Sequence, residues 1–134
     1  MPDVDIIGTN GMSTNIQAFS RDADLILVFL SITCEPCTES LRAFGASAEG
    51  GQVRVIGICE DDVEYAKVYV AKNAIPFAVY SDTGSVFFEK YGVHVFPTVV
   101  GVHRGGDIAF VKHGADPSFG YEDAIHLLRD ATEE

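Results

Sequence analysis

Two cysteines separated by two residues, in the segment Cys34-Glu35-Pro36-Cys37, are the side chains of this chain best suited to chemistry. A C-x-x-C pair serves either as a redox dithiol or as half of a zinc site. Structural zinc normally takes four ligands, and the third cysteine and the four histidines include no second pair at close ligand spacing. The spacing therefore favours reversible disulfide chemistry, and we expect no metal and no organic cofactor.

The predicted elements around this segment place its first cysteine where a thiolate is stabilised. Residues 25–30 form a continuous apolar run of strand-forming residues, and residues 38–48 have the pattern of a helix. Cys34 would then lie at the helix N-terminus, where unpaired backbone N–H groups favour the thiolate. Because the thiolate is the attacking species in disulfide exchange, we predict Cys34 as the nucleophile and Cys37 as the resolving cysteine.

The two residues between the cysteines shape the predicted site further. Pro36 holds the turn, and it lacks an N–H group that the start of a helix leaves unpaired in any case. Glu35 adds negative charge beside the thiols, which opposes the thiolate and predicts a weaker oxidant than an uncharged dipeptide would give. The alternative for Glu35 is an ordinary solvated acid at the start of a helix.

Along the rest of the chain, short apolar runs alternate with amphipathic segments. We predict strands at residues 53–58, 77–80, 98–102 and 108–111, and helices at residues 61–72, at residues 85–91 and from about residue 116 onward. The turn signal Asn10-Gly11 predicts an N-terminal hairpin, and residues 104–107 predict a late one. Strands separated by helices require crossovers and a parallel core. We therefore expect one domain, residues 1–134, built as a three-layer α/β/α sandwich.

The composition excludes several classes of partner. The chain has 134 residues, 9 Lys plus Arg and 20 Asp plus Glu, which gives a net charge of −11. Nucleic acid and anionic membrane surfaces require a basic face, so neither is expected. No apolar run is long enough to span a membrane. The first residues carry acid where an export signal carries base, so the chain as written predicts a cytoplasmic protein.

With strand, dithiol and helix in this order, the chain resembles the thioredoxin superfamily, and within it the TlpA/ResA-like thiol–disulfide oxidoreductases related to redoxin domains. The resemblance rests on the dithiol segment, on the loop at residues 91–98 and on a strand-and-helix insertion at residues 61–80. It implies a thioredoxin-like fold with this insertion and a late antiparallel hairpin. It also implies that Pro97 is cis and faces the dithiol. Because the proline ring supplies no N–H group, we expect the backbone of Phe96 to pair with an extended substrate. The alternative for Pro97 is an ordinary proline at the start of a strand.

The chain departs from the family pattern near the predicted site. Thr33 stands where the family usually has Trp, and the chain contains no Trp. Val28 stands where thioredoxins carry a buried acid that takes the proton of the resolving cysteine. ResA-like proteins have Glu where this chain has Ser40, and Glu39 lies about 100° around the predicted helix from that position. Proton transfer would then fall to Glu39, to Glu35 or to water.

Two further residues are candidate modulators of the dithiol. Cys59 ends a predicted strand at the sheet edge that carries the dithiol, where α/β proteins tend to build sites. We interpret Cys59 as a packed small residue, with a third reactive thiol as the alternative. His94, in the loop before Pro97, either modulates the pair or is an exposed loop histidine.

The resemblance implies a monomeric enzyme that reduces protein disulfides and is recharged by an upstream thiol reductant. Many members of the family act outside the cytoplasm, some in cytochrome c maturation, so the resemblance implies an extracytoplasmic location if an export segment is missing. Two alternatives remain open. One is a thiol peroxidase in which Cys34 reacts with peroxide, since Ser31-Ile32-Thr33 keeps part of the turn found before the peroxiredoxin cysteine. The other is a non-catalytic metal-binding module, suggested by Cys59 and His94.

Overall fold

The computed structural model describes residues 5–8, 13–15, 21, 23–31, 38, 53–75, 78–82, 88–89, 92–93, 95–114 and 121–132. Within these ranges the strands are β1 (Asp5–Gly8), β2 (Ser13–Asn15), β3 (Leu25–Leu30), β4 (Arg54–Cys59), β5 (Val79–Ser81), β6 (Thr98–Val102) and β7 (Ile108–His113). The described helices are α3 (Val63–Asn73) and α5 (Tyr121–Thr132).

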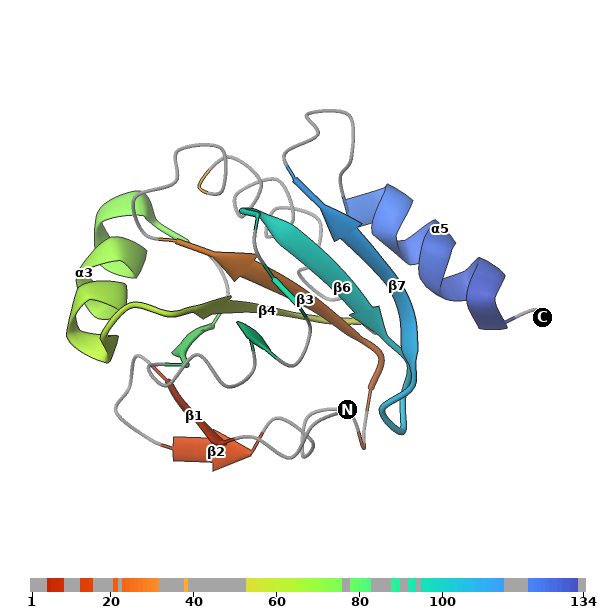
Figure 1. Ribbon diagram of the computed structural model, residues 1–134, viewed down its shortest axis with the longest axis horizontal. Coiled ribbons are helices and arrows are strands. Elements are labelled where there is room, and N and C mark those ends of the chain that lie inside the picture. The colour runs from red at the N-terminus through yellow and green to blue at the C-terminus, as the bar shows by residue number, and fades with distance from the viewer. Residues whose placement is uncertain are drawn as a thin grey trace.

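The described strands form one mixed sheet with the order β2-β1-β5-β4-β3-β6-β7 (Figure 1). β3, β4 and β5 run parallel, so their carboxyl ends share one edge. β6 runs antiparallel to β3, and β7 runs antiparallel to β6. The sheet thus has the parallel centre and the late antiparallel hairpin that the sequence predicts.

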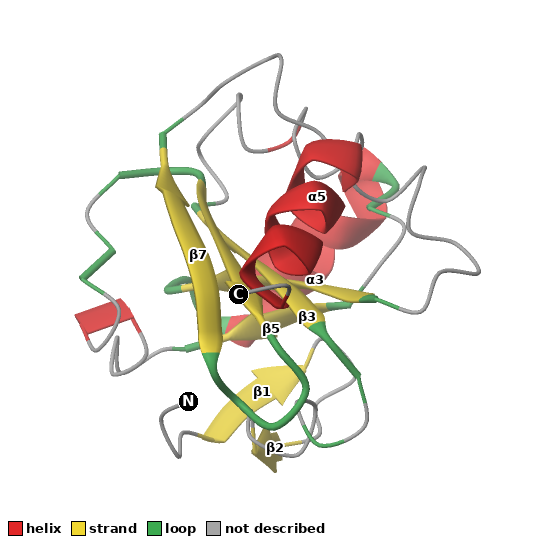
Figure 2. Cartoon of the chain, turned by 90° about the vertical axis from the view of Figure 1, so that its right-hand side faces the viewer, coloured by secondary structure: helices red, strands yellow, loops and turns green. Residues whose placement is uncertain are grey.

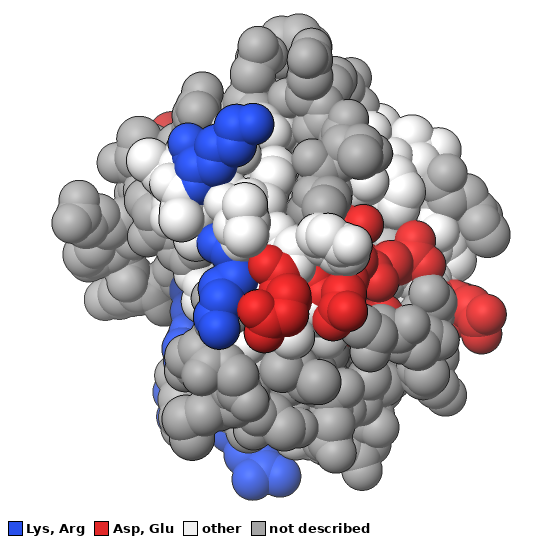
Figure 3. Space-filling model, turned by 90° about the vertical axis from the view of Figure 1, so that its left-hand side faces the viewer, with Lys and Arg blue, Asp and Glu red and all other residues white. Residues whose placement is uncertain are grey.

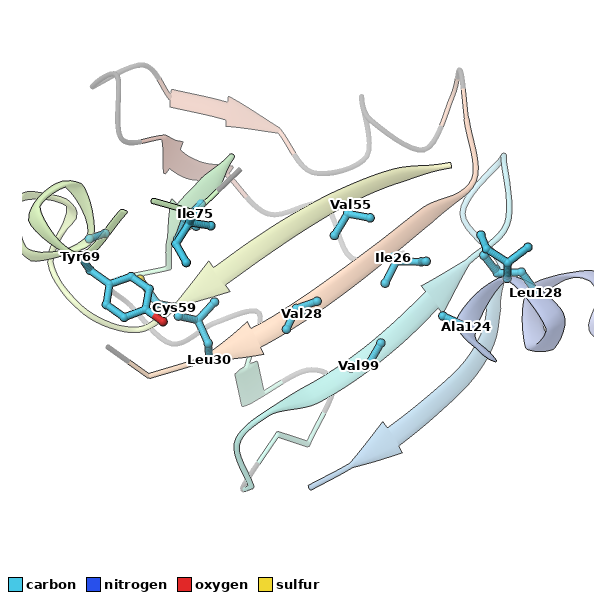
Figure 4. Packing of buried hydrophobic residues seen from close by; sticks show 13 residues of the cluster. Ile26, Val28, Leu30, Val55, Cys59, Tyr69, Ile75, Val99, Ala124 and Leu128 are labelled. Carbon is cyan, nitrogen blue, oxygen red and sulfur yellow. The ribbon is translucent and has the colours of Figure 1, made fainter. Parts of the chain in front are cut away.

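Both described helices cover the same face of the sheet, as Figure 2 shows. On this face, Ala66 and Tyr69 of α3 and Leu128 of α5 belong to one buried cluster with alternate residues of β3 and β4 (Figure 4). Among the described residues, Phe88 and Val93 pack against the opposite face. Since β3 is covered on both faces, every one of its side chains is buried, which explains its unbroken apolar run.

The predicted elements are confirmed wherever they are described, with shifted ends. α3 begins at Val63 rather than at residue 61, and Asp62 takes the N-cap position without a side-chain cap hydrogen bond. α3 ends where Ala74 adopts a left-handed conformation with φ of 52°. Of the predicted helices at residues 38–48 and 85–91, the structure describes residue 38 and residues 88–89, and all three are helical.

The N-terminal hairpin is confirmed, and it extends the main sheet. β1 pairs with β2, as the Asn10-Gly11 signal predicts, but it also pairs antiparallel with β5, where Ile7 lies opposite Ser81. The turn signal predicts the pairing of neighbouring strands. It carries no information about a partner that lies far along the chain.

Candidate functional site

The predicted dithiol lies outside the described residues, as do Thr33, Cys34, Glu35, Pro36, Cys37, Glu39 and His94. Ser31 and Thr38 are the described residues on either side of the segment. The hydroxyl of Thr38 shares a hydrogen bond of 2.6 Å with the hydroxyl of Tyr69 on α3. The residue directly after Cys37 is therefore tied to α3, and the roles of the two cysteines remain predictions.

Three parallel strands end at the edge from which the dithiol segment starts. Leu30 pairs with Cys59, and Cys59 pairs with Ser81. Ser31 follows Leu30 directly, so the dithiol segment leaves the sheet next to Cys59. This is the edge at which open α/β sheets place their binding sites.

The loop before β6 contains the second predicted part of the site. The Phe96–Pro97 peptide bond is cis, as the resemblance implies. Pro97 is buried, and its carbonyl accepts a hydrogen bond of 2.8 Å from the backbone N–H of Gly114. The buried hydroxyl of Thr98 donates a hydrogen bond of 2.7 Å to the carbonyl of Val95. Hydrogen bonds thus hold the loop on both sides of Pro97.

The pairing of β3 with β6 locates this loop relative to the dithiol segment. Phe29 lies opposite Thr98 in an antiparallel register. If that register is continued by one residue, Pro97 lies opposite Leu30, next to the start of the dithiol segment. The Pro97 loop and the end of β3, which leads to the segment that carries Cys34, therefore lie at one edge of the sheet.

The structure adds a histidine that the sequence analysis did not select. His113 Nδ1 lies 3.3 Å from the hydroxyl oxygen of Thr98. The one proton of that hydroxyl is donated to Val95, so Nδ1 must be the donor in this second bond. His113 is not predicted from sequence because the apolar pattern of β7 ends at residue 111, two residues before the strand ends.

Cys59 is packed in the core. It is fully buried, and its thiol donates a weak hydrogen bond of 3.8 Å to the carbonyl of Asp61. Burial above all, and then the negative charges of Asp61 and Asp82, raise the pKa of the Cys59 thiol from 9.0 to about 12. The thiol is therefore protonated at neutral pH, which favours the packed residue over a third reactive thiol.

Asp82 is the second residue that the sequence analysis missed. It follows β5 directly and is 3% exposed. Its carboxylate accepts a hydrogen bond of 3.2 Å from the backbone N–H of Phe88, and its own N–H donates one of 2.7 Å to the carbonyl of Cys59. An acid directly after a buried strand at the site edge is the signal that would have identified it.

Acidic side chains gather where β4 leads into α3. Glu60, Asp62 and Glu64 are exposed there, and Figure 3 shows a cluster of acidic atoms on this side of the molecule. Lys67 lies 3.9 Å from Glu64 in an exposed ion pair. This excess of negative charge disfavours a thiolate at the same edge, as Glu35 is also predicted to do.

The described part of the chain contains neither a metal-binding cluster nor a membrane-spanning helix. No group of three or more His, Cys, Asp or Glu side chains within it is placed to hold a metal ion. None of its helices is long and apolar enough to cross a membrane.

Comparisons with known proteins identify the family. The Redoxin family model matches residues 1–125. No curated protein sequence gave a match. The solved structures similar to this chain include a candidate thiol:disulfide interchange protein, DsbE, from Chlorobium tepidum, with a TM-score of 0.82 and 22% identity over 97% of this chain and 93% of that chain.

Two further solved structures have the same fold. StoA from Bacillus subtilis has a TM-score of 0.75 and 17% identity over 94% of this chain and 96% of that chain. The peroxidoxin BcpB from Mycobacterium tuberculosis has a TM-score of 0.81 and 16% identity over 97% of this chain and 94% of that chain. The thioredoxin-like α/β fold implied by the resemblance is confirmed. The chain belongs to the redoxin family and is a thiol–disulfide oxidoreductase.

Proposed function

We propose that this oxidoreductase reduces protein disulfides through Cys34 and Cys37. The supporting observation is that the Pro97 loop and the strand leading to the dithiol lie at one edge, since Thr98, directly after Pro97, pairs with Phe29, directly before Leu30. Membership of the redoxin family supports dithiol chemistry at this place. The similar structure named as a thiol:disulfide interchange protein supports disulfides as the substrate.

The proposed reaction transfers two electrons from the dithiol to the substrate. The Cys34 thiolate attacks one sulfur of the substrate disulfide, that S–S bond breaks, and the departing substrate sulfur takes up a proton. The Cys37 thiolate then attacks the Cys34 sulfur of the mixed disulfide and releases the second substrate thiol. Cys34 and Cys37 end as a disulfide, which an upstream dithiol partner reduces again.

Pro97 and Phe96 would hold the substrate during this exchange. Pro97 has no N–H group, and its carbonyl accepts the hydrogen bond from Gly114, so we assign the pairing with an extended peptide to the backbone of Phe96. The reaction needs neither a metal nor an organic cofactor. Keeping haem-attachment cysteines reduced during cytochrome c maturation would be one special case of this activity.

Reduction of insulin by the full chain, with dithiothreitol as electron donor, tests the proposal. Replacing Cys34 with Ser should abolish catalysis, and replacing Cys37 with Ser should trap a mixed disulfide on Cys34. Cys59→Ala is the matched control and should keep wild-type activity, because its buried thiol is protonated. Unchanged activity in both the Cys34 and the Cys37 variants would refute the proposal.

A second candidate is peroxide reduction, which the likeness to the peroxidoxin BcpB favours. The Cys34 thiolate would attack one peroxide oxygen, giving a sulfenic acid and water, and Cys37 would condense with it to a disulfide and a second water. Rapid peroxide consumption that is lost in Cys34→Ser, in a chain that does not reduce insulin, would support this candidate. Metal retained in stoichiometric amount, with a dithiol that never titrates, would instead support the non-catalytic metal-binding module.

A further inference from the structure

Asp82 and Phe88 are two buried residues to which the proposed chemistry gives no role. Asp82 is 3% exposed and Phe88 is 2% exposed. The carboxylate of Asp82 accepts a hydrogen bond of 3.2 Å from the backbone N–H of Phe88. A carboxylate is a stronger acceptor than a neutral group. Asp82 therefore fixes the backbone of Phe88 relative to the end of β5.

The ring of Phe88 contacts two other aromatic rings. It meets Phe29 edge-on, with ring centroids 5.0 Å apart and an interplanar angle of 89°. It also meets Phe96 in a tilted arrangement, with centroids 5.8 Å apart. Both geometries are favourable for aromatic pairs. The three rings form a continuous aromatic contact inside the core.

The outer two rings of this contact belong to the two parts of the proposed site. Phe29 is on β3, two residues before Ser31, where the dithiol segment begins. Phe96 directly precedes Pro97. The ring of Phe88 therefore lies between the strand that leads to the dithiol and the loop proposed to hold the substrate.

A second contact of Phe88 acts on the same loop. Its carbonyl accepts a hydrogen bond of 2.9 Å from the backbone N–H of Val93, which lies three residues before Phe96. Val93 is itself buried in the same cluster as Phe29 and Phe88. The backbone and the ring of Phe88 both hold the chain that leads to Pro97.

We propose that Asp82 and Phe88 are positioning residues that set the distance between the Pro97 loop and the dithiol. Asp82 holds the backbone of Phe88, and the Phe88 ring holds Phe96 against β3. This inference rests on the proposed function, because a peptide that pairs with Phe96 reaches the dithiol only if this distance is correct. A small disulfide makes no backbone pairing with Phe96, so the rate of its reduction does not depend on this distance. Asp82 and Phe88 therefore favour extended protein substrates over small disulfides.

The test compares two substrates in single-turnover reactions of the reduced full chain. Insulin is the extended substrate, and the chromogenic disulfide DTNB is the small one, without a peptide backbone. We expect Phe88→Leu to lower the second-order rate constant for insulin roughly five- to tenfold and to leave that for DTNB within about twofold. Asp82→Asn preserves side-chain size and should lower the ratio of the insulin rate constant to the DTNB rate constant by a smaller factor. This variant carries the test if Phe88→Leu does not fold.

Phe110→Leu is the matched control, because it makes the same substitution on β7, where the Phe110 ring lies next to Gly101. It should lower the melting temperature without changing the insulin-to-DTNB ratio. An unchanged ratio in the folded Phe88 and Asp82 variants, or an equal fall in Phe110→Leu, would overturn the positioning role. A wild-type chain that reduces DTNB but not insulin would overturn the proposed function, and this inference with it.

Discussion

At the scale of single residues, the surroundings of a thiol decide its chemistry. Cys59 is buried at the end of β4, near the carboxyl groups of Asp61 and Asp82. Desolvation and negative charge both favour its protonated form. Cys34 is predicted at a helix N-terminus, where backbone N–H groups favour the thiolate instead. The chain thus contains an unreactive cysteine, Cys59, and a cysteine that is predicted to be reactive, Cys34.

The pKa of Cys59 predicts how stability depends on pH. The thiol has a pKa of about 12 in the folded chain, against its ordinary value of 9.0. Below pH 9.0 the thiol is protonated in both states and adds no pH dependence. Between the two values the unfolded chain loses this proton and the folded chain keeps it, so the free energy of unfolding should fall by about 1.4 kcal/mol per pH unit.

Urea unfolding of the wild type and of Cys59→Ala, from about pH 8 to about pH 11, isolates this contribution from the other titrating groups. The free energy of unfolding of the wild type minus that of Cys59→Ala should be constant at the lower end of this pH range and fall steadily above pH 9.0. A difference that stays constant across the whole range would show that the folded state does not hold the proton on Cys59.

At the scale of elements, buried strands are predictable from sequence, whereas their partners and ends are not. β3 and β4 were predicted nearly residue for residue, because continuous apolar runs mark strands covered on both faces. The pairing of β1 with β5 was not predicted, because contacts between distant segments leave no local pattern. Similarly, the extension of β7 to His113 depends on its pairing with Thr98.

Close packing between β6 and β7 gives a testable prediction. Gly101 lies opposite Phe110, and a Cβ atom at Gly101 would clash with the Phe110 ring. Gly101→Ala should therefore destabilise the fold by about 1–3 kcal/mol, measured by urea unfolding. In the Gly101→Ala background, Phe110→Leu should cost less than it does in the wild type, since it removes the clash. Strictly additive losses would contradict this packing.

At the scale of the whole molecule, the sheet brings distant parts of the sequence to one edge. The chain leaves β3 at Leu30, β4 at Cys59 and β5 at Ser81, and it enters β6 after Pro97. The cis peptide bond before Pro97 could be predicted from sequence because its motif is local. The hydrogen-bond partners of Asp82 and His113 could not be predicted, because the fold brings those partners together from distant parts of the sequence.

Net charge belongs to this scale as well. The chain carries a net charge of −11, and exposed acids lie near the site edge. Like charges repel at the encounter of two proteins, so strongly acidic partners are disfavoured. The same negative field opposes a thiolate at the dithiol, which favours reducing over oxidising behaviour.

The reduction potential of the Cys34–Cys37 couple tests the central claim most directly. The full chain is equilibrated in thiol–disulfide buffers, its free thiols are alkylated, and the oxidised fraction is read by mass, with Cys59→Ala as control. A reductant should show one reversible two-electron couple near thioredoxin's potential, roughly −270 mV. A potential near about −120 mV, typical of a strong oxidant, or a dithiol that does not titrate at all, would contradict the account.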